Sequence, residues 1–181
     1  YKVVKPAIDL LAGIPSVVYG FFGMVVIVPV VSQLFGGSGK SMLTASILLG
    51  IMILPTIIGV SEAALRAVPM SYYEGAVAMG ARHERAIFTV MVPAAKSGVL
   101  AGIVLGIGRA IGETAVVLYT MGQAINLPIS PLDSGRPMTV HLYLLANDGI
   151  NMNAAYGTAL LLMAIILAFN LFARYLSRKR R

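Results

Sequence analysis

The pattern of hydrophobic and polar residues is dominated by four long apolar stretches. They cover residues 11–35, 42–60, 97–121 and 155–175. A helix needs about 20 mostly apolar residues to cross the hydrocarbon core of a bilayer. Prolines and glycines interrupt the first stretch, which membrane helices tolerate because neighbouring groups satisfy the freed backbone. Since no stretch alternates as a strand would, the pattern predicts an all-α membrane protein, a polytopic helical bundle forming a single domain over residues 1–181.

Two polar segments connect these stretches and have patterns of their own. Residues 62–93 are too polar to span a membrane, yet Ser71 followed by Glu74 predicts a capping box that starts a short helix. Gly80 predicts the end of that helix in a left-handed conformation, and a second short helix is expected before Pro93. Residues 123–153 are rich in turn residues and predict a long ordered external loop with a short helix near residues 141–146.

Composition supports the membrane assignment. Of the 181 residues, 58% are hydrophobic and 12% are charged, whereas soluble domains have about 45–50% apolar and about 25% charged residues. This excludes soluble globular, disordered and fibrous proteins. The absence of cysteine excludes a disulfide scaffold, a zinc–thiolate site and a thiol nucleophile. Neither histidine has a second ligand at metal spacing, and we expect no catalytic residue and no metal site in this chain.

The net charge of +7 has an uneven distribution. Lys and Arg gather before the first stretch, between the second and third, and after the fourth, while the two other connections hold only Lys40 and Arg136. Cytoplasmic loops carry the excess of Lys and Arg in membrane proteins. The distribution therefore predicts a multi-pass membrane protein with residues 62–93 and both ends of the present chain on the cytoplasmic side.

Arg109 and Glu113 lie inside the third apolar stretch, followed by Thr114. A charge in lipid costs about 2.5–3.5 kcal/mol even on the gentler scale, so both side chains must face protein or water. Their spacing of four predicts one helical face and an ion pair. Two interpretations stay open. In the first, the pair fixes helix packing. In the second, it lines a translocation path, in which the Arg109 guanidinium binds an oxyanion and Glu113 lowers the affinity so that the anion is released.

Glycines accompany these charges along the same stretch. Gly98, Gly102 and Gly106 recur every four residues and continue toward Arg109. Small residues at this spacing let a second helix approach closely. Gly108 and Gly112 have no side chains, so that another group can approach the helix backbone beside the charges. These five glycines are therefore predicted to serve helix packing.

The order of residues from Glu74 to Pro93 resembles the EAA motif of ABC importer permeases. That motif is E-A-A, three residues, G, nine residues, I, any residue and L-P. The matching positions here are Glu74, Gly75, Ala76, Gly80, Val90, Val92 and Pro93. The departures, at Gly75, Val90 and Val92, are small or apolar. The resemblance implies that this segment is the coupling helix, which docks in a groove of the ATP-hydrolysing subunit.

Further stretches, at residues 13–20, 65–69 and 108–114, look like the phosphate-specific permeases of the PstA/PstC type. Residues 139–174 look more like PstA, whereas residues 51–55 and 94–108 look more like PstC; the PstA type is favoured. The resemblance implies the MetI-like fold, with four of an expected six transmembrane helices present.

The same resemblance implies ATP-driven import of inorganic phosphate across the cytoplasmic (inner) membrane. It implies three kinds of partner: ABC ATPase subunits, a second permease subunit and an external phosphate-binding protein. It implies no cofactor in this chain, with ATP and Mg bound by the ATPase, and no nucleic acid as partner. A permease for another oxyanion, such as molybdate or sulfate, and a secondary transporter or channel without an ATPase remain as alternatives. The amphipathic segment before Pro93 distinguishes the last of these, because such a transporter has no need for it.

Overall fold

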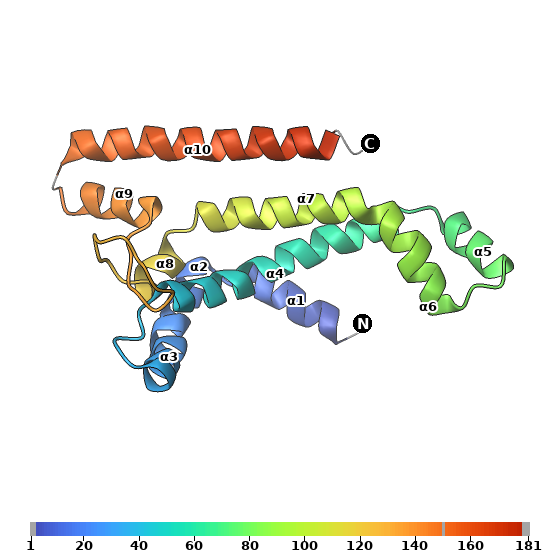
Figure 1. The fold of residues 1–181 in the computed structure, drawn as a ribbon, viewed down its shortest axis with the longest axis horizontal. Helices are drawn as coiled ribbons and strands as arrows, with labels where there is room; N and C mark the ends of the chain where they lie inside the picture. The colour runs from blue at the N-terminus through green and yellow to red at the C-terminus, as the bar shows by residue number, and fades with distance from the viewer. Residues whose placement is uncertain (1–2, 150, 179–181) are drawn as a thin grey trace. The chain divides into compact units, whose positions relative to one another are not determined.

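The computed structural model describes residues 3–149 and 151–178, which form helices, turns and loops and no strand. Its elements in chain order are α1 (Val4–Gly13), α2 (Ser16–Phe22), η1 (Gly23–Ile27), α3 (Val28–Phe35), α4 (Met42–Arg66), α5 (Met70–Ala78), α6 (His83–Ala86), η2 (Ile87–Met91), α7 (Val92–Ile111), α8 (Ala115–Thr120), α9 (Met138–Asn147) and α10 (Met152–Arg178) (Figure 1).

In the described part of the chain, four helical stretches are long and apolar enough to cross a membrane. They are Ser16–Phe35, Met42–Arg66, His83–Ile111 and Met152–Ala173. The predicted all-α membrane architecture with four spans is thereby confirmed. The chain divides into two compact units. The first contains Tyr1–Pro55 and Arg109–Ala168, and the second contains Thr56–Gly108 and Phe169–Arg181.

The first apolar stretch is broken near its start. Pro15 precedes α2 with extended backbone angles, and α1 is a separate helix. A proline inside a helix removes a backbone donor and clashes with the preceding turn, so the span begins at Ser16 and not at residue 11 as predicted. The Tyr19 hydroxyl donates to the Leu11 carbonyl at 2.8 Å. This bond ties α2 to α1 across the break.

The described chain contains two π-helical turns, η1 and η2, each of which ends two residues before a proline. Pro29 follows η1, and Pro93 follows η2. A proline ring clashes with the carbonyl four residues earlier. The wider turn, in which Val28 N–H donates to the Gly23 carbonyl five residues back, accommodates the ring. Both helices therefore continue through their prolines.

The core of the first unit lies where α2 and α8 pack beside the first half of α4 (Figure 1). Its buried residues are Tyr19, Leu48, Met52 and Val116. Gly20 makes the approach of α8 to α2 possible, because a Cβ there would lie 2.9 Å from the Ala115 carbonyl oxygen. A side chain at Gly20 would force the two helices apart.

The loop between α8 and α9, residues 123–137, is named the outer segment here after its predicted side of the membrane. Together with the end of α8 it caps the N-terminus of α4. The first amides of a helix have no partner within it. Here the N–H groups of Ser41, Met42 and Leu43 donate to the carbonyl oxygens of Thr120, Asp133 and Pro131, at 3.0, 2.9 and 2.7 Å respectively. The predicted external loop is thus fixed to the first unit through its backbone, and the short helix predicted within it is α9.

In the second unit, the end of α4 packs against the start of α7 through glycine. A Cβ on Gly98 would lie 2.3 Å from Ala64 Cβ, and one on Gly102 would lie 3.1 Å from Val60 Cβ. Figure 1 shows these two helix segments side by side. The spacing of four, read from the sequence, brings both glycines onto the face that meets α4.

Gly98→Ala is expected to destabilise the protein by about 1–3 kcal/mol, because overpacking forces backbone shifts. Thermal unfolding of the purified protein in detergent measures the change. Ala64→Gly in the Gly98→Ala background returns the missing space and should recover most of the loss. Gly59→Ala on α4 is the matched control, since a Cβ there meets nothing within 4 Å. Equal destabilisation by Gly98→Ala and Gly59→Ala would contradict the close approach.

Candidate functional site

Helix α5 carries the first half of the EAA-like motif. The helix begins after Pro69, whose extended angles (φ −56°, ψ 135°) precede the first turn. The predicted capping box is wrong, because Ser71 lies inside the helix and the described N-cap makes no side-chain hydrogen bond. Proline suits this position since it has no amide that needs a partner in the first turn. Glu74 is an exposed residue in the middle of α5.

Gly80 ends α5 in the conformation that its place in the sequence predicts. Its φ is +85°, a region that glycine enters without steric penalty. Gly80 N–H donates to the Val77 carbonyl at 2.8 Å, and Ala81 N–H donates to the Ala76 carbonyl at 3.1 Å. This pair of bonds is a Schellman motif, which satisfies the last carbonyls of the helix.

The second half of the motif lies in the helix that enters the membrane. The predicted separate short helix before Pro93 is wrong: α6, η2 and α7 follow one another without a break, and His83–Ile111 forms one 29-residue stretch. Val90 belongs to η2, while Val92 and Pro93 start α7. The π-helical turn explains the difference, because it lets the helix continue through Pro93.

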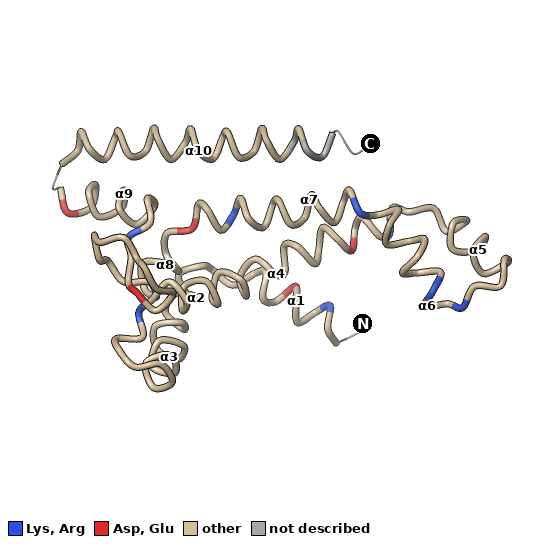
Figure 2. The backbone as a smooth tube through the Cα atoms, in the orientation of Figure 1, with Lys and Arg blue, Asp and Glu red and all other residues tan. Residues whose placement is uncertain are grey.

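The surface of α5 is open. Of residues 70–78, all of which the structure describes, none is buried. Met70 and Val77 are 60% and 41% exposed, and Met79 in the following turn is 90% exposed. Helices α5 and α6 form a hairpin, and Figure 2 shows Lys and Arg on its α6 side. Exposed apolar side chains thus lie beside cations on this part of the protein.

The residues predicted to line a path lie at a helix break in the first unit. Helix α7 ends at Ile111, and α8 starts at Ala115. The prediction of a continuous helix over 97–121, with Arg109 and Glu113 on one face, is therefore wrong. The physical reason is the Glu113 carboxylate, whose Oε1 accepts the amides of Ala115 and Val116 at 3.1 and 3.4 Å. It thereby supplies the cap that starts α8.

Glu113 is also fixed through its backbone. The Thr139 hydroxyl at the start of α9 donates to the Glu113 carbonyl oxygen at 3.0 Å. Thr114 is the N-cap residue of α8 and makes no side-chain cap bond of its own there. Arg109 lies in the last turn of α7, where a cation is favoured by the helix dipole. Glu113 and Thr139 therefore meet at the break, while Arg109 lies on α7.

A pocket of about 180 Å³ opens beside Glu113. It is lined by Met42, Ala45, Ser46, Leu49, Ala110, Ile111, Glu113, Val117, Met121, Pro137 and Thr139. Among these described lining residues the charged one is a carboxylate, and none is Lys or Arg. This pocket on its own does not favour an anion, because the charge that it presents is negative.

The outer segment presents apolar side chains that the sequence analysis did not single out. Ile125, Leu127 and Ile129 are 82%, 89% and 96% exposed. Their alternation along an extended segment is the signal that would have found them. Asp133 holds the base of this segment, since its Oδ2 accepts the amides of Ser130 and Ile129 at 2.7 and 2.8 Å.

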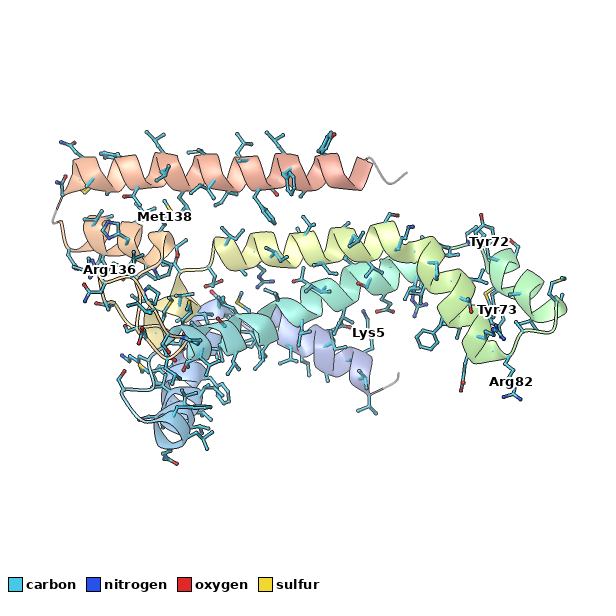
Figure 3. All side chains as sticks on the ribbon, in the orientation of Figure 1. Lys5, Tyr72, Tyr73, Arg82, Arg136 and Met138 are labelled. Carbon is cyan, nitrogen blue, oxygen red and sulfur yellow. The ribbon has the colours of Figure 1, made fainter. Side chains whose placement is uncertain are left out.

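The hydrogen bonds from Ser130 and then Ile129 lower the pKa of Asp133 below its ordinary value. Because the folded pKa is lowered, the support that this carboxylate gives the turn is present at neutral pH. That support is lost only as the pH falls through the folded pKa. Arg136 adds a bond from Nε to the Gln123 carbonyl at 3.1 Å (Figure 3), so the outer segment is fixed at both of its ends.

The sequence matches, over residues 1–181, the family described as the binding-protein-dependent transport system inner membrane component. The chain belongs to this family. It is 40% identical to the probable ABC transporter permease protein YqgH of Bacillus subtilis (strain 168), over 99% of this chain and 60% of that protein.

Two further relatives extend this picture of the permease family. The chain is 34% identical to the phosphate transport system permease protein PstC of Xylella fastidiosa (strain 9a5c), over 95% of this chain and 58% of that protein. It is 30% identical to the probable permease YqgI of Bacillus subtilis, over 96% of this chain and 63% of that protein. The chain therefore spans about 60% of the length of these curated relatives. No solved structure matches it.

These relatives bear on the choice between the two phosphate permease types. The sequence analysis favoured PstA, whereas PstC is the type named for the Xylella relative and for others at similar identity. The resemblance to the phosphate permeases is confirmed, and the preference for PstA is not supported by these matches.

Glu113→Ala is expected to lower the free energy of unfolding by about 1 kcal/mol, because α8 loses the side chain that accepts its first amides. Glu113→Gln keeps an acceptor oxygen in the same place and should stay close to the wild type. Thermal unfolding in detergent compares the two variants. If Gln destabilises as much as Ala, the negative charge and not the cap stabilises the break.

Proposed function

We propose that this chain is the membrane permease subunit of an ATP-driven ABC importer that carries inorganic phosphate across the cytoplasmic membrane. The observation that carries the proposal is the open α5 helix ending at Gly80, directly before the helix that enters the membrane. Membership of the permease family and the 34% identity to PstC proteins support it.

The docking helix of this proposal is α5. An amphipathic helix with exposed apolar residues binds by laying them into a groove. Met70 and Val77, seven residues apart on one face of α5, would enter a groove of an ABC ATPase subunit, which binds ATP and Mg. Four of the coupling residues predicted from the motif, Glu74, Gly75, Ala76 and Gly80, lie on α5 or in the turn that ends it. The other three predicted residues, Val90, Val92 and Pro93, lie in η2 and the first turn of α7.

The translocation path of this proposal passes the break between α7 and α8. Interrupted helices are a common way to build a solute site inside a membrane. Arg109 supplies five donors in a planar fork that suits phosphate oxygens. Glu113 holds the break in its shape and faces the path together with Thr114, and a second permease subunit encloses the other side of the path.

The orientation follows from the distribution of Lys and Arg. We place the α5–α6 hairpin and both ends of the present chain on the cytoplasmic side. The outer segment then faces an external phosphate-binding protein. Family membership favours this arrangement over a secondary transporter or channel. A permease for molybdate or sulfate is the second candidate, because a guanidinium binds any tetrahedral oxyanion, and competition of these anions with radiolabelled phosphate uptake decides between them.

Gly80→Ala is expected to weaken binding of the ATPase. An L-residue in the left-handed region costs about 1–2 kcal/mol, so the turn after α5 should lose its shape. Co-purification of the ATPase with the chain, expressed together with its partner subunits, measures the effect.

The matched comparison is Gly75→Ala, the same chemical change five residues earlier. A Cβ at Gly75 also meets nothing within 4 Å, but that position is helical, where Ala is favoured over Gly by about 1 kcal/mol. Gly75→Ala should therefore retain the ATPase. Equal losses in both variants would contradict a role for the left-handed turn, and no co-purification with the unaltered chain would refute the ABC assignment.

Arg109→Ala is expected to abolish phosphate uptake by the assembled transporter in liposomes while co-purification of its subunits persists. Arg109→Lys keeps the charge without the fork and should retain a part of the uptake. Arg66→Ala is the control, since the Arg66 side chain is 66% exposed and pairs with Glu62 at 3.0 Å, and ion pairs near the surface contribute little. Joint loss of uptake and assembly in Arg109→Ala would show that Arg109 is structural.

A further inference from the structure

A side-chain contact links α5 to the start of the helix that enters the membrane. A hydrogen bond of 2.5 Å links the Tyr73 hydroxyl on α5 to His83 Nδ1 on α6. The two rings also meet edge to face, with centroids 5.4 Å apart and planes at 81°. In Figure 3 the Tyr73 side chain lies between α5 and α6.

The backbone of the intervening turn does not provide this link. The two bonds that end α5, from Gly80 and Ala81, both return to carbonyls of α5 itself. They terminate the helix without attaching it to the next one. Within α6, which the structure describes throughout, only Ala86 is buried. Helix α5 also packs against α6 and η2. The Tyr73–His83 contact adds to this packing a side-chain hydrogen bond with a defined direction.

The position of His83 connects this contact to the membrane-spanning helix. His83 is the first residue of the continuous helical stretch that ends at Ile111. A displacement of α5 therefore reaches the end of that stretch through the imidazole ring. The hydrogen bond resists separation of the two helices, while the edge-to-face ring contact has its own preferred geometry and resists rotation.

We propose that Tyr73 and His83 are a positioning pair, through which movement of the docking helix α5 is transmitted to the helix that crosses the membrane. The inference rests on the proposed function, because it assigns the mechanical link of the same ATPase-binding site. The pair does not touch the transported solute. Its role is to keep ATP hydrolysis and solute movement in step.

The test uses the complete transporter, with its ATPase and second permease, in liposomes. Phosphate taken up per ATP hydrolysed is measured, because loss of folded or assembled protein lowers both rates and leaves their ratio unchanged. Tyr73→Phe keeps the ring and removes the hydroxyl. We expect the ATPase to stay bound and to hydrolyse ATP, while uptake per ATP falls about fivefold, as for the loss of one hydrogen bond.

Tyr72→Phe is the matched control: it makes the same chemical change one residue earlier, at a side chain that is 53% exposed, and the ratio should stay at the wild-type value. His83→Phe keeps an aromatic ring and should lower the ratio as Tyr73→Phe does. The double variant Tyr73→Phe/His83→Phe should be no worse than either single one, because both remove the same bond.

An unchanged ratio in Tyr73→Phe and His83→Phe would overturn the inference, as would an equal fall in Tyr72→Phe or a double variant whose loss is the product of the two single losses. Failure of the proposed function has a different signature. In that case the unaltered chain would bind no ATPase, or the assembled complex would hydrolyse ATP without phosphate uptake.

Discussion

The structure depends on one constraint: a backbone polar group in a bilayer must find its partner inside the protein. Every interruption of a helix in this chain therefore needs a substitute partner nearby. At the break before α2, a tyrosine hydroxyl bonds to the last turn of α1. At the break between α7 and α8, the Glu113 carboxylate accepts two amides of α8. The start of α4 takes carbonyls from the outer segment.

This constraint also explains why polar residues follow directly after the span that ends at Ile111. Glu113 and Thr139 lie outside the four candidate spans, and their hydrogen bonds join the start of α8 to the start of α9. The polar side chains of the third stretch are thus part of the architecture around the break. On the proposed path, a solute at this break would meet groups whose positions backbone hydrogen bonds already determine.

The sequence was sufficient for the features that depend on long periodic patterns. The four spans, the glycine face of α7 and the left-handed Gly80 follow from apolar length, from a spacing of four and from the place of a glycine after a short helix. The ends of helices were predicted less well. Ser71 is a good N-cap residue, but Pro69 already starts α5. The spacing of Arg109 and Glu113 predicted one helical face, but α7 ends at Ile111 and the Glu113 carboxylate accepts the first amides of α8. The contact of Tyr73 with His83 joins residues from two helices, and no periodicity within either helix reports it.

The two π-helical turns have a consequence for chain length. A turn closed by bonds that span five residues holds one residue more than an α-helical turn. Each of η1 and η2 therefore absorbs a single extra residue, and every side chain beyond it is rotated by about 100° from where an uninterrupted α-helix would place it. A relative that is one residue shorter at either turn, and lacks the proline, would keep the same faces of its helices. Alignments of such proteins should accordingly place single-residue gaps inside these two helices as well as in the loops.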